Sequence, residues 1–275
     1  MSAMHPEAPS LRIAVWQAAS TPRDVAANLA SLDDAARRAA ADGAELLVAP
    51  EMYLTGYNIG ADIARLAAER PLERAREIAR RRGIALVAGG PEPLGEATSA
   101  IANAAWLVDD RGEVLARHRK IQLFGDLDRV HFVPGDAPVT LARFRGFTIA
   151  LLICFDVEYP ETVRAAALDG ADLIAVPTAQ MAPFSFVNEH LIRTRAWESS
   201  VYVAYANQVG TDGDFDYVGR SVIADPLGAH LAEAGPDGAE LLTARIDRAR
   251  IAEARRQNTY LSEVRRELFA PRATP

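Results

Sequence analysis

Three residues of this sequence have side chains suited to acyl chemistry. Glu51 and the only cysteine, Cys154, follow runs rich in Val, Ile, Leu and Ala, and Lys120 closes a shorter run. A carboxylate among apolar neighbours has a raised pKa and can serve as a general base, while a fixed ammonium can stabilise developing negative charge. Each residue also has a structural interpretation, as a surface-loop glutamate, a solvated strand-end lysine or a small buried thiol. Residue type and position alone leave both interpretations open.

The setting of Cys154 gives the functional interpretation more weight. This cysteine ends the most apolar of the predicted strands and sits in a short turn before a helix. That helix should begin at Pro160, because proline suits the first turn, where its missing N–H costs nothing. The positive end of the helix would lower the pKa of the thiol from its ordinary value of about 8.5. We therefore treat a catalytic thiol and a buried structural thiol as equally compatible with this turn.

The elements that position these residues form an α/β pattern with a mixed sheet. Short apolar runs alternate with longer amphipathic stretches, and several runs are continuous in aliphatic residues, as in strands covered on both faces. The Asp-Asp-Arg-Gly sequence at 109–112 predicts a hairpin turn. The predicted strands are residues 11–17, 45–49, 85–90, 101–108, 114–119, 147–153, 173–177 and 201–207, and the predicted helices are residues 24–41, 72–82, 161–168 and 188–199.

Length and composition limit the kinds of protein this chain can be. Its 275 residues, 49% of them apolar, are enough for a substantial core, and no linker-like segment divides them. We predict one domain over residues 11–269, with an N-terminal tail at 1–10 and a C-terminal tail at 270–275. The net charge of −7 argues against nucleic acid as a partner, because phosphate binding needs clustered Lys and Arg.

The location of the protein is predicted from segments that the sequence lacks. No run of about 18 apolar residues could span a membrane, and the first ten residues do not have the apolar centre of a secretory signal. A single cysteine excludes internal disulfides and suits a reducing compartment. We expect a cytoplasmic protein with no membrane partner.

Four segments in order resemble the nitrilase superfamily of carbon–nitrogen hydrolases, over about residues 11–269. They are Pro50-Glu51 with Thr55-Gly56-Tyr57, Arg119-Lys120, the elbow from Cys154 to Glu161, and Arg195-Ala-Trp-Glu198. Each motif alone is only moderately specific to the family, but four motifs in the order of the family are strong evidence of a resemblance. The resemblance implies an α-β-β-α sandwich, two copies of which pair into a larger sandwich in a homodimer. In the family, pairing commonly uses the helix corresponding to residues 188–199 and C-terminal segments.

The resemblance also implies a catalytic triad of Glu51, Lys120 and Cys154. In the family mechanism the glutamate takes the thiol proton as sulfur attacks the amide carbon. Lys120 and the backbone N–H of Phe155 would stabilise the oxyanion, and an acyl-thioester would remain on the cysteine until water releases the acid. This chemistry needs no metal and no organic cofactor.

A fourth acidic position departs from the family pattern. Members often carry a second glutamate four residues before the Phe of a Phe-x-Pro-Gly pattern, which here is Phe132-Val-Pro-Gly135. The matching residue is Asp128, one methylene shorter, and Asp126 lies nearby. We assign the catalytic role to Asp128, since a carboxylate is retained, although its reach is shorter.

The residues around the nucleophile favour amide substrates. True nitrilases usually follow the nucleophile with Trp-Glu, whereas this chain has Phe155-Asp156. Carbamoyl-amino-acid hydrolases tend to place an arginine in this elbow, where this chain has Glu158, which could instead receive a cationic substrate or brace the elbow. The expected substrate-binding residues are Phe155, Tyr57, Phe124, Glu158, Tyr159 and Met181, with Tyr53 and Phe184 as further candidates for an apolar pocket.

The predicted function is therefore hydrolysis of a small carboxamide to a carboxylic acid and ammonia. On the same triad, hydrolysis of N-carbamoyl amines or amino acids, or of nitriles, is the alternative, and acyl transfer to another amine is a variant. A catalytically silent binding protein on this scaffold would not need to retain all three triad residues. A redox-sensing thiol protein would tolerate loss of Lys120, but the chain contains no second cysteine to resolve an oxidised thiol.

Overall fold

The structure, a computed structural model that describes residues 8–95 and 100–268, is built on two six-stranded sheets. The first sheet has the spatial order β14 (Glu240–Asp247), β1 (Ser10–Gln17), β2 (Leu46–Val48), β3 (Ala85–Pro93), β4 (Ile101–Val108) and β5 (Val114–Arg119). The second has the order β13 (His230–Glu233), β12 (Val222–Ala224), β9 (Tyr202–Ala206), β8 (Leu173–Pro177), β7 (Phe147–Leu151) and β6 (Leu141–Phe144). A separate two-stranded ribbon is formed by β10 (Val209–Asp212) and β11 (Phe215–Val218).

Strand β1 shows how alternation along a strand builds two cores. It pairs in parallel with β2 and antiparallel with β14, so it is covered on both edges. Leu11, Ile13 and Val15 point into the core between the two sheets, while Ala14 and Trp16 belong to the core under the helices. The period of two places successive side chains on opposite faces of a sheet. A continuous apolar run is thus required for a strand buried on both sides.

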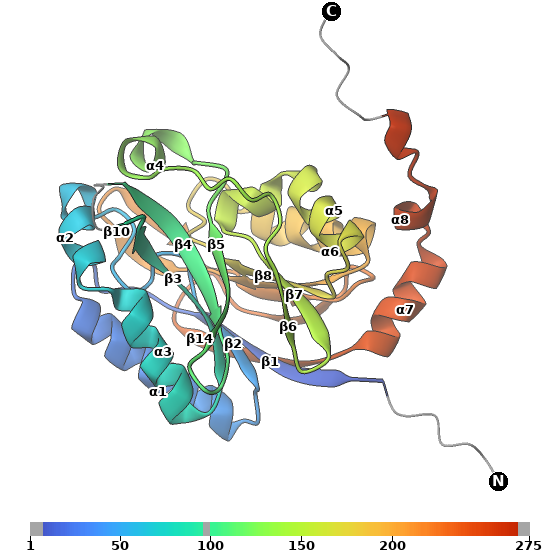
Figure 1. Cartoon of the computed structure of the whole chain (residues 1–275), viewed down its shortest axis with the longest axis horizontal. Helices are drawn as coiled ribbons and strands as arrows, with labels where there is room; N and C mark the ends of the chain where they lie inside the picture. The colour runs from blue at the N-terminus through green and yellow to red at the C-terminus, as the bar shows by residue number, and fades with distance from the viewer. Residues whose placement is uncertain (1–7, 96–99, 269–275) are drawn as a thin grey trace, which may run out of the picture.

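Helices cover the outer face of each sheet and complete an α-β-β-α sandwich. Figure 1 shows α1 and α3 on one side of the sheets and α5 and α6 on the other, with α7 and α8 extending toward the C-terminus. The helices are α1 (Val25–Ala41), α2 (Ile63–Ala68), α3 (Pro71–Arg82), α4 (Gly125–His131), α5 (Pro160–Leu168), α6 (Ile192–Ser199), α7 (Arg248–Gln257) and α8 (Tyr260–Glu263). The mixed α/β architecture expected from the sequence is confirmed.

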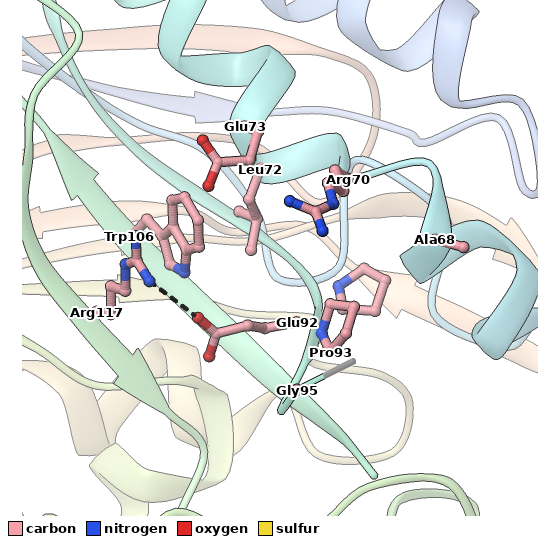
Figure 2. Close-up of a pocket in the computed structure, with 10 residues that line it drawn as sticks. Ala68, Arg70, Leu72, Glu73, Glu92, Pro93, Gly95, Trp106 and Arg117 are labelled. Atoms are coloured by element: carbon pink, nitrogen blue, oxygen red, sulfur yellow. Dashed lines mark ion pairs between the residues drawn. The ribbon is translucent and has the colours of Figure 1, made fainter. Parts of the chain in front are cut away.

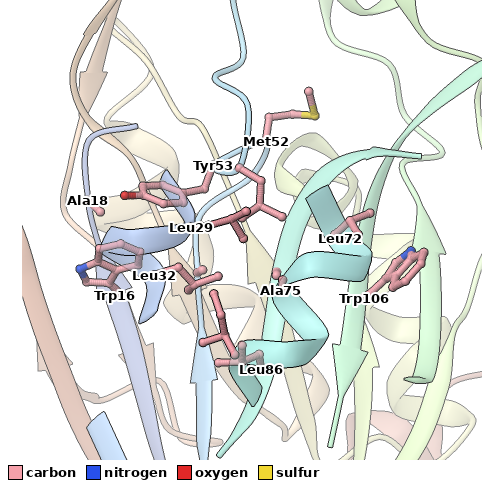
Figure 3. Close-up of a cluster of buried hydrophobic side chains, with 14 of the residues drawn as sticks. Trp16, Ala18, Leu29, Leu32, Met52, Tyr53, Leu72, Ala75, Leu86 and Trp106 are labelled. Carbon is pink, nitrogen blue, oxygen red and sulfur yellow. The ribbon is translucent and has the colours of Figure 1, made fainter. Parts of the chain in front are cut away.

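The core between the first sheet and its helices is rich in large side chains. Trp16 from β1, Leu32 from α1, Leu86 from β3 and Trp106 from β4 all belong to this buried cluster (Figure 3). Burying an aliphatic side chain of this size contributes about 1.5–3 kcal/mol to folding. This packing fixes α1 and α3 on the sheet and so holds the strand ends at which the chemically interesting loops begin.

The predicted elements agree with the structure in the central strands and differ at the periphery. The hairpin turn is present, since the N–H of Asp109 donates to the carbonyl of Glu113 at 2.9 Å. The predicted helix 188–199 begins as a π-helix over Val187–Leu191 before α6 continues it. Strands β6 and β10 to β14 and helices α2, α4, α7 and α8 were not expected, because most are short and lack a clear apolar period.

The predicted tails lie largely beyond the described residues. All of the C-terminal tail at 270–275 and residues 1–7 of the N-terminal tail are outside the described ranges. Within the described part, β1 already begins at Ser10. Among the helices described, none is long and apolar enough to cross a bilayer.

Candidate active site

The turn that carries Glu51 follows β2 and lies directly against β3. Met52 in this turn has a positive φ of 51°, and the backbone passes unusually close to Gly89. A Cβ atom on Gly89 would lie 2.9 Å from both the nitrogen of Met52 and the carbonyl oxygen of Pro50. Only a residue without a side chain allows this approach. The close packing fixes the position of Glu51.

Lys120 lies between two carboxylates in a fully buried cluster. Its Nζ is 2.8 Å from Oε1 of Glu51 and 2.8 Å from Oδ2 of Asp128, and all three side chains have no exposed surface. Asp128 is on α4, whereas the side chain of Asp126 two residues earlier is fully exposed beside Arg129. The structure therefore brings together Glu51, Lys120 and Asp128, three of the four residues predicted to be catalytic. The nearby Asp126, to which no catalytic role was assigned, lies outside the cluster.

Neighbouring side chains hold the two carboxylates in place. Asn103 on β4 donates to Oε1 of Glu51 at 2.6 Å, and the hydroxyl of Tyr57 donates to Oδ1 of Asp128 at 2.8 Å. The other oxygen of Glu51, Oε2, is buried and has no hydrogen-bond partner within the described residues. Sequence reasoning did not single out Asn103, although a lone amide inside an apolar strand was a signal for it. One oxygen of Glu51 thus remains available to receive a proton.

Burial and charge shift the proton affinities of this cluster in definite directions. Burial raises the pKa of Glu51, the ammonium of Lys120 opposes that rise, and Asp128 adds to it. For Lys120, burial alone would lower the pKa, but Glu51, Tyr57 and Asp128 outweigh burial and hold that pKa well above its ordinary value. The lysine is therefore a permanent cation, while Glu51 is a carboxylate that accepts a proton more readily than an exposed one.

Cys154 occupies a tight elbow between β7 and α5. Its φ is +44°, an unfavourable value for a residue with a side chain, and it begins a short 3₁₀ turn, Cys154–Glu158. The buried carboxylate of Asp156 braces this elbow by accepting from the N–H of Ile153 at 3.0 Å. Backbone strain of this kind persists only where surrounding contacts hold it.

Asp156 also ties the cysteine elbow to the segment that follows Lys120. It accepts from the N–H groups of Ile121 at 3.1 Å and Gln122 at 2.8 Å, and it lies 3.0 Å from Nε2 of His118. The sequence placed Asp156 in the motif but gave no sign of this bridging role. The bridge links the turns that carry Lys120 and Cys154.

The expected lowering of the cysteine pKa was wrong. Burial raises the pKa of the Cys154 thiol well above its ordinary value, the carboxylate of Glu51 raises it further, and Lys120 only partly opposes them. The side chain is only 7% exposed, and α5 begins six residues later at Pro160. Desolvation therefore outweighs any effect of the helix end, and the resting thiol keeps its proton.

A narrow pocket opens beside Cys154. Its lining residues are Tyr57, Phe124, Cys154, Glu158, Ala179, Gln180, Met181 and Phe184. Gln180 was not anticipated; its Oε1 lies 3.7 Å from the sulfur of Cys154. Four of the expected binding residues, Tyr57, Phe124, Glu158 and Met181, are among this lining. A space this narrow favours a small substrate.

The remaining predicted binding residues lie beside this pocket or away from it. The ring of Phe155 packs edge-on against the lining residue Phe124 at 5.3 Å and against Tyr159 at 5.1 Å, so Phe155 and Tyr159 support the lining without belonging to it. Tyr53, proposed as a pocket residue, instead stacks on Trp16 at 4.6 Å in the buried core. That expectation was wrong, because the side chain turns toward the helix layer.

A larger cavity of about 390 Å³ lies elsewhere, between the start of α3 and the outer face of β3 to β5 (Figure 2). Its carboxylates are engaged by arginines: Glu73 is 2.8 Å from Arg76, and Glu92 is 2.7 Å from Arg119. No cysteine, serine or histidine lines it among the described residues. Size alone therefore does not mark the reactive site.

Within the described ranges, no group of three His, Cys, Asp or Glu side chains is arranged to hold a metal ion.

Known proteins match this chain in sequence and in fold. The sequence pattern of the family described as carbon-nitrogen hydrolase matches residues 12–256, and the chain belongs to that family. The "Hydrolase in pqqF 5'region" of Pseudomonas protegens is 43% identical over 82% of this chain and 79% of its own length. The (R)-stereoselective amidase of Pseudomonas sp is 35% identical over 82% of this chain and 81% of its own length.

Solved structures of one amidase superpose closely on this fold. The amidase from Nesterenkonia sp. AN1, in a variant with the acetamide moiety of fluoroacetamide added covalently at the active-site cysteine, is 39% identical, with a TM-score of 0.86 and 98% of each chain covered. Another variant of that amidase, in complex with butyramide, is 38% identical, with a TM-score of 0.87 over 97% of this chain and 98% of its own. The expected membership of the nitrilase superfamily and the expectation of an amidase-type hydrolase are confirmed.

Proposed function

We propose that this chain hydrolyses small carboxamides to the carboxylic acid and ammonia through a thioester on Cys154. The observation that carries the proposal is the buried Oε2 of Glu51, which has no hydrogen-bond partner among the described residues, in a cluster where the charges of Glu51 and Lys120 both act on the Cys154 thiol. A protonated cysteine needs a base before it can attack, and this oxygen is the available acceptor. The adduct at the active-site cysteine of the Nesterenkonia amidase supports the same role for the cysteine of this chain.

The first half of the reaction forms the thioester. Glu51 takes the proton of Cys154 as the sulfur bonds to the amide carbon, and the carbonyl oxygen becomes an oxyanion. Lys120 and the N–H of Phe155 stabilise that charge. The protonated Glu51 then gives its proton to the amide nitrogen, the C–N bond breaks, and ammonia leaves.

The second half releases the acid. Glu51 removes a proton from water as the water oxygen attacks the thioester carbon, and the C–S bond breaks. The proton returns to sulfur, so that the resting states of Glu51 and Cys154 are restored. Asp128 has a positioning role, since it holds the ammonium of Lys120 opposite Glu51.

A substrate panel tests this proposal. Native enzyme and Cys154→Ala are assayed with butanamide, a carbamoyl amine and butanenitrile, with release of ammonia as the readout. We expect turnover of the amide by the native enzyme and none by the variant. Intact-mass measurement during slow turnover should show an acyl adduct on native protein alone. Turnover of the nitrile alone, or undiminished activity without the thiol, would contradict the proposal.

The alternatives on the same triad have distinct outcomes in that panel. Nitrile hydrolysis is a real competitor, because a protein called nitrilase from Pyrococcus abyssi is 32% identical over 75% of this chain. Carbamoyl amino acids are disfavoured, since a carboxylate on the substrate would meet the carboxylate of Glu158 in the pocket. Adding hydroxylamine would reveal acyl transfer as a hydroxamate product.

The chain is also proposed to pair with a second copy of itself. Trp197 on α6 and Tyr260 on α8 are 40% and 45% exposed and pack edge-on at 5.0 Å, which leaves an aromatic surface on the outer helices. Light scattering should give twice the mass of one chain, and Trp197→Ser should lower it to that of one chain.

We retain as proposals one domain over residues 11–269 and a cytoplasmic location, which suits a free buried thiol.

A further inference from the structure

Glu158 is an acidic residue of the pocket that the proposed mechanism does not use. Its side chain lines the same space as Cys154, yet it forms no ion pair among the described residues. Glu51 and Asp128, by contrast, both lie 2.8 Å from the ammonium of Lys120. The pocket therefore contains a carboxylate that has no direct ion-pair partner in the part of the chain that the structure describes.

The nearest arginine is committed elsewhere. Arg195 on α6 donates from Nε to the carbonyl of Val157 at 3.0 Å and from Nη2 to the carbonyl of Glu158 at 2.5 Å. Its Nη1 donates to the carboxylate of Glu198 at 2.9 Å. The guanidinium thus fixes the backbone of the elbow and leaves the carboxylate of Glu158 to face the pocket.

The surroundings of Glu158 would strengthen its interaction with a charged ligand. Three of the other lining residues, Phe124, Met181 and Phe184, are apolar, so that screening by water is reduced. The charged and titratable groups that act on Glu158 are Lys120, Arg195 and the phenol of Tyr205. The side chain of Gln180 is a hydrogen-bond partner of the Glu158 carboxyl. With two carboxylates already sharing Lys120, an ionised Glu158 leaves the pocket with an excess of negative charge.

We propose that Glu158 makes the enzyme selective for small amides that carry an ammonium group on the acyl chain, over neutral isosteres and over amides that carry a carboxylate. This inference rests on the proposed amidase function and names its substrate class. The ammonium would pair with the carboxylate of Glu158 while the amide carbon lies at the sulfur of Cys154. An acyl-chain carboxylate would instead be repelled and desolvated without a partner.

Ionisation of Glu158 gives the selectivity a pH dependence. Burial raises the pKa of this carboxyl to about 7, against the opposing effects of Lys120, Arg195 and Gln180. The carboxyl is therefore neutral in mild acid and anionic above neutrality. The preference for an ammonium substrate should increase as the pH rises through this value.

The experiment compares three amides of similar size: 3-aminopropanamide, butanamide and succinamic acid. We measure kcat/KM for each with native enzyme and Glu158→Gln at about pH 8.5, where the carboxyl is ionised and a primary alkylammonium is still largely protonated. The native enzyme should favour the ammonium amide over butanamide, and the variant should lose about tenfold or more of that ratio. Because the readout is a ratio, a uniform change in turnover cancels. The control Glu161→Gln, an exposed carboxylate in the first turn of α5, should keep the native ratio.

A second readout needs no variant, in case Glu158→Gln does not fold. The ratio for native enzyme, measured from about pH 5.5 to 8.5, should rise through neutrality, since ionisation of Glu51 and Cys154 affects both substrates alike. A native ratio near one at all pH values, or an unchanged ratio in the variant, would overturn this inference alone. If native enzyme hydrolyses none of the amides, the proposed function fails and this inference fails with it.

Discussion

Oδ2 of Asp128 lies 2.8 Å from Nζ of Lys120, so the shorter acid reaches the lysine without the extra methylene of a glutamate. The backbone makes up the difference. Helix α4 begins at Gly125, and the N–H of Phe124 donates to the same oxygen at 2.9 Å, which draws the carboxylate inward. The other oxygen accepts from Tyr57. Asp128 therefore has hydrogen bonds on both oxygens and a fixed distance to the lysine.

Replacing Asp128 by Asn should lower kcat/KM for a neutral amide by about 100-fold. Lys120 would lose one of its two charge-assisted hydrogen bonds, each worth about 1.5–3 kcal/mol, and its ammonium would no longer be held in place. Steady-state kinetics with butanamide checks this expectation. The matched control is Asp126→Asn, whose fully exposed carboxylate should be dispensable. Equal losses in both variants would show that α4 is sensitive to any substitution.

Glu51→Gln should reduce kcat by about 10²–10⁴-fold while the fold is retained. The amide preserves the shape of the side chain but cannot accept a proton from Cys154 or from water. Rapid-quench kinetics would follow formation of the acyl adduct, which should slow together with ammonia release. Normal formation of the adduct with slow hydrolysis alone would show that another group deprotonates the thiol.

The sequence was sufficient to predict the strands that carry the reactive residues, because both faces of those strands are buried. It could not decide between Asp126 and Asp128 on chemistry, since both are acids two residues apart. The α4 helix decides this by turning one inward and the other to solvent.

The sequence also could not predict effects that depend on residues far apart in the chain. The pKa of Cys154 was expected to fall, yet desolvation in a pocket lined by segments far apart in the chain raises it. Asn103 lies 52 residues from Glu51, with which it bonds, and nothing local to either residue specifies that contact. Local pattern thus predicts the elements, whereas the electrostatics of the site follows from tertiary packing.

Asp156→Ala should destabilise the protein by about 3–5 kcal/mol, because one buried and two partly buried backbone N–H groups, together with the buried ring of His118, would lose their acceptor. Urea unfolding followed by circular dichroism measures the change in the free energy of unfolding. The exposed Asp136→Ala is the comparison and should stay within about 0.5 kcal/mol of native. A small effect at Asp156 would mean that the two reactive turns keep their positions independently.

The pH profile for a neutral amide should have its acidic limb above the ordinary glutamate pKa of 4.5, because burial raises the pKa of Glu51 and attack requires its ionised form. Activity should rise as the pH increases through that raised value. The basic side should stay flat well beyond neutrality, since the pKa of Lys120 is raised and its charge persists. Measurements of kcat/KM for butanamide in native enzyme and Glu158→Gln separate the two carboxyl groups. An acidic limb that disappears in Glu158→Gln would assign the titration to Glu158 and would contradict Glu51 as the base whose ionisation controls the rate.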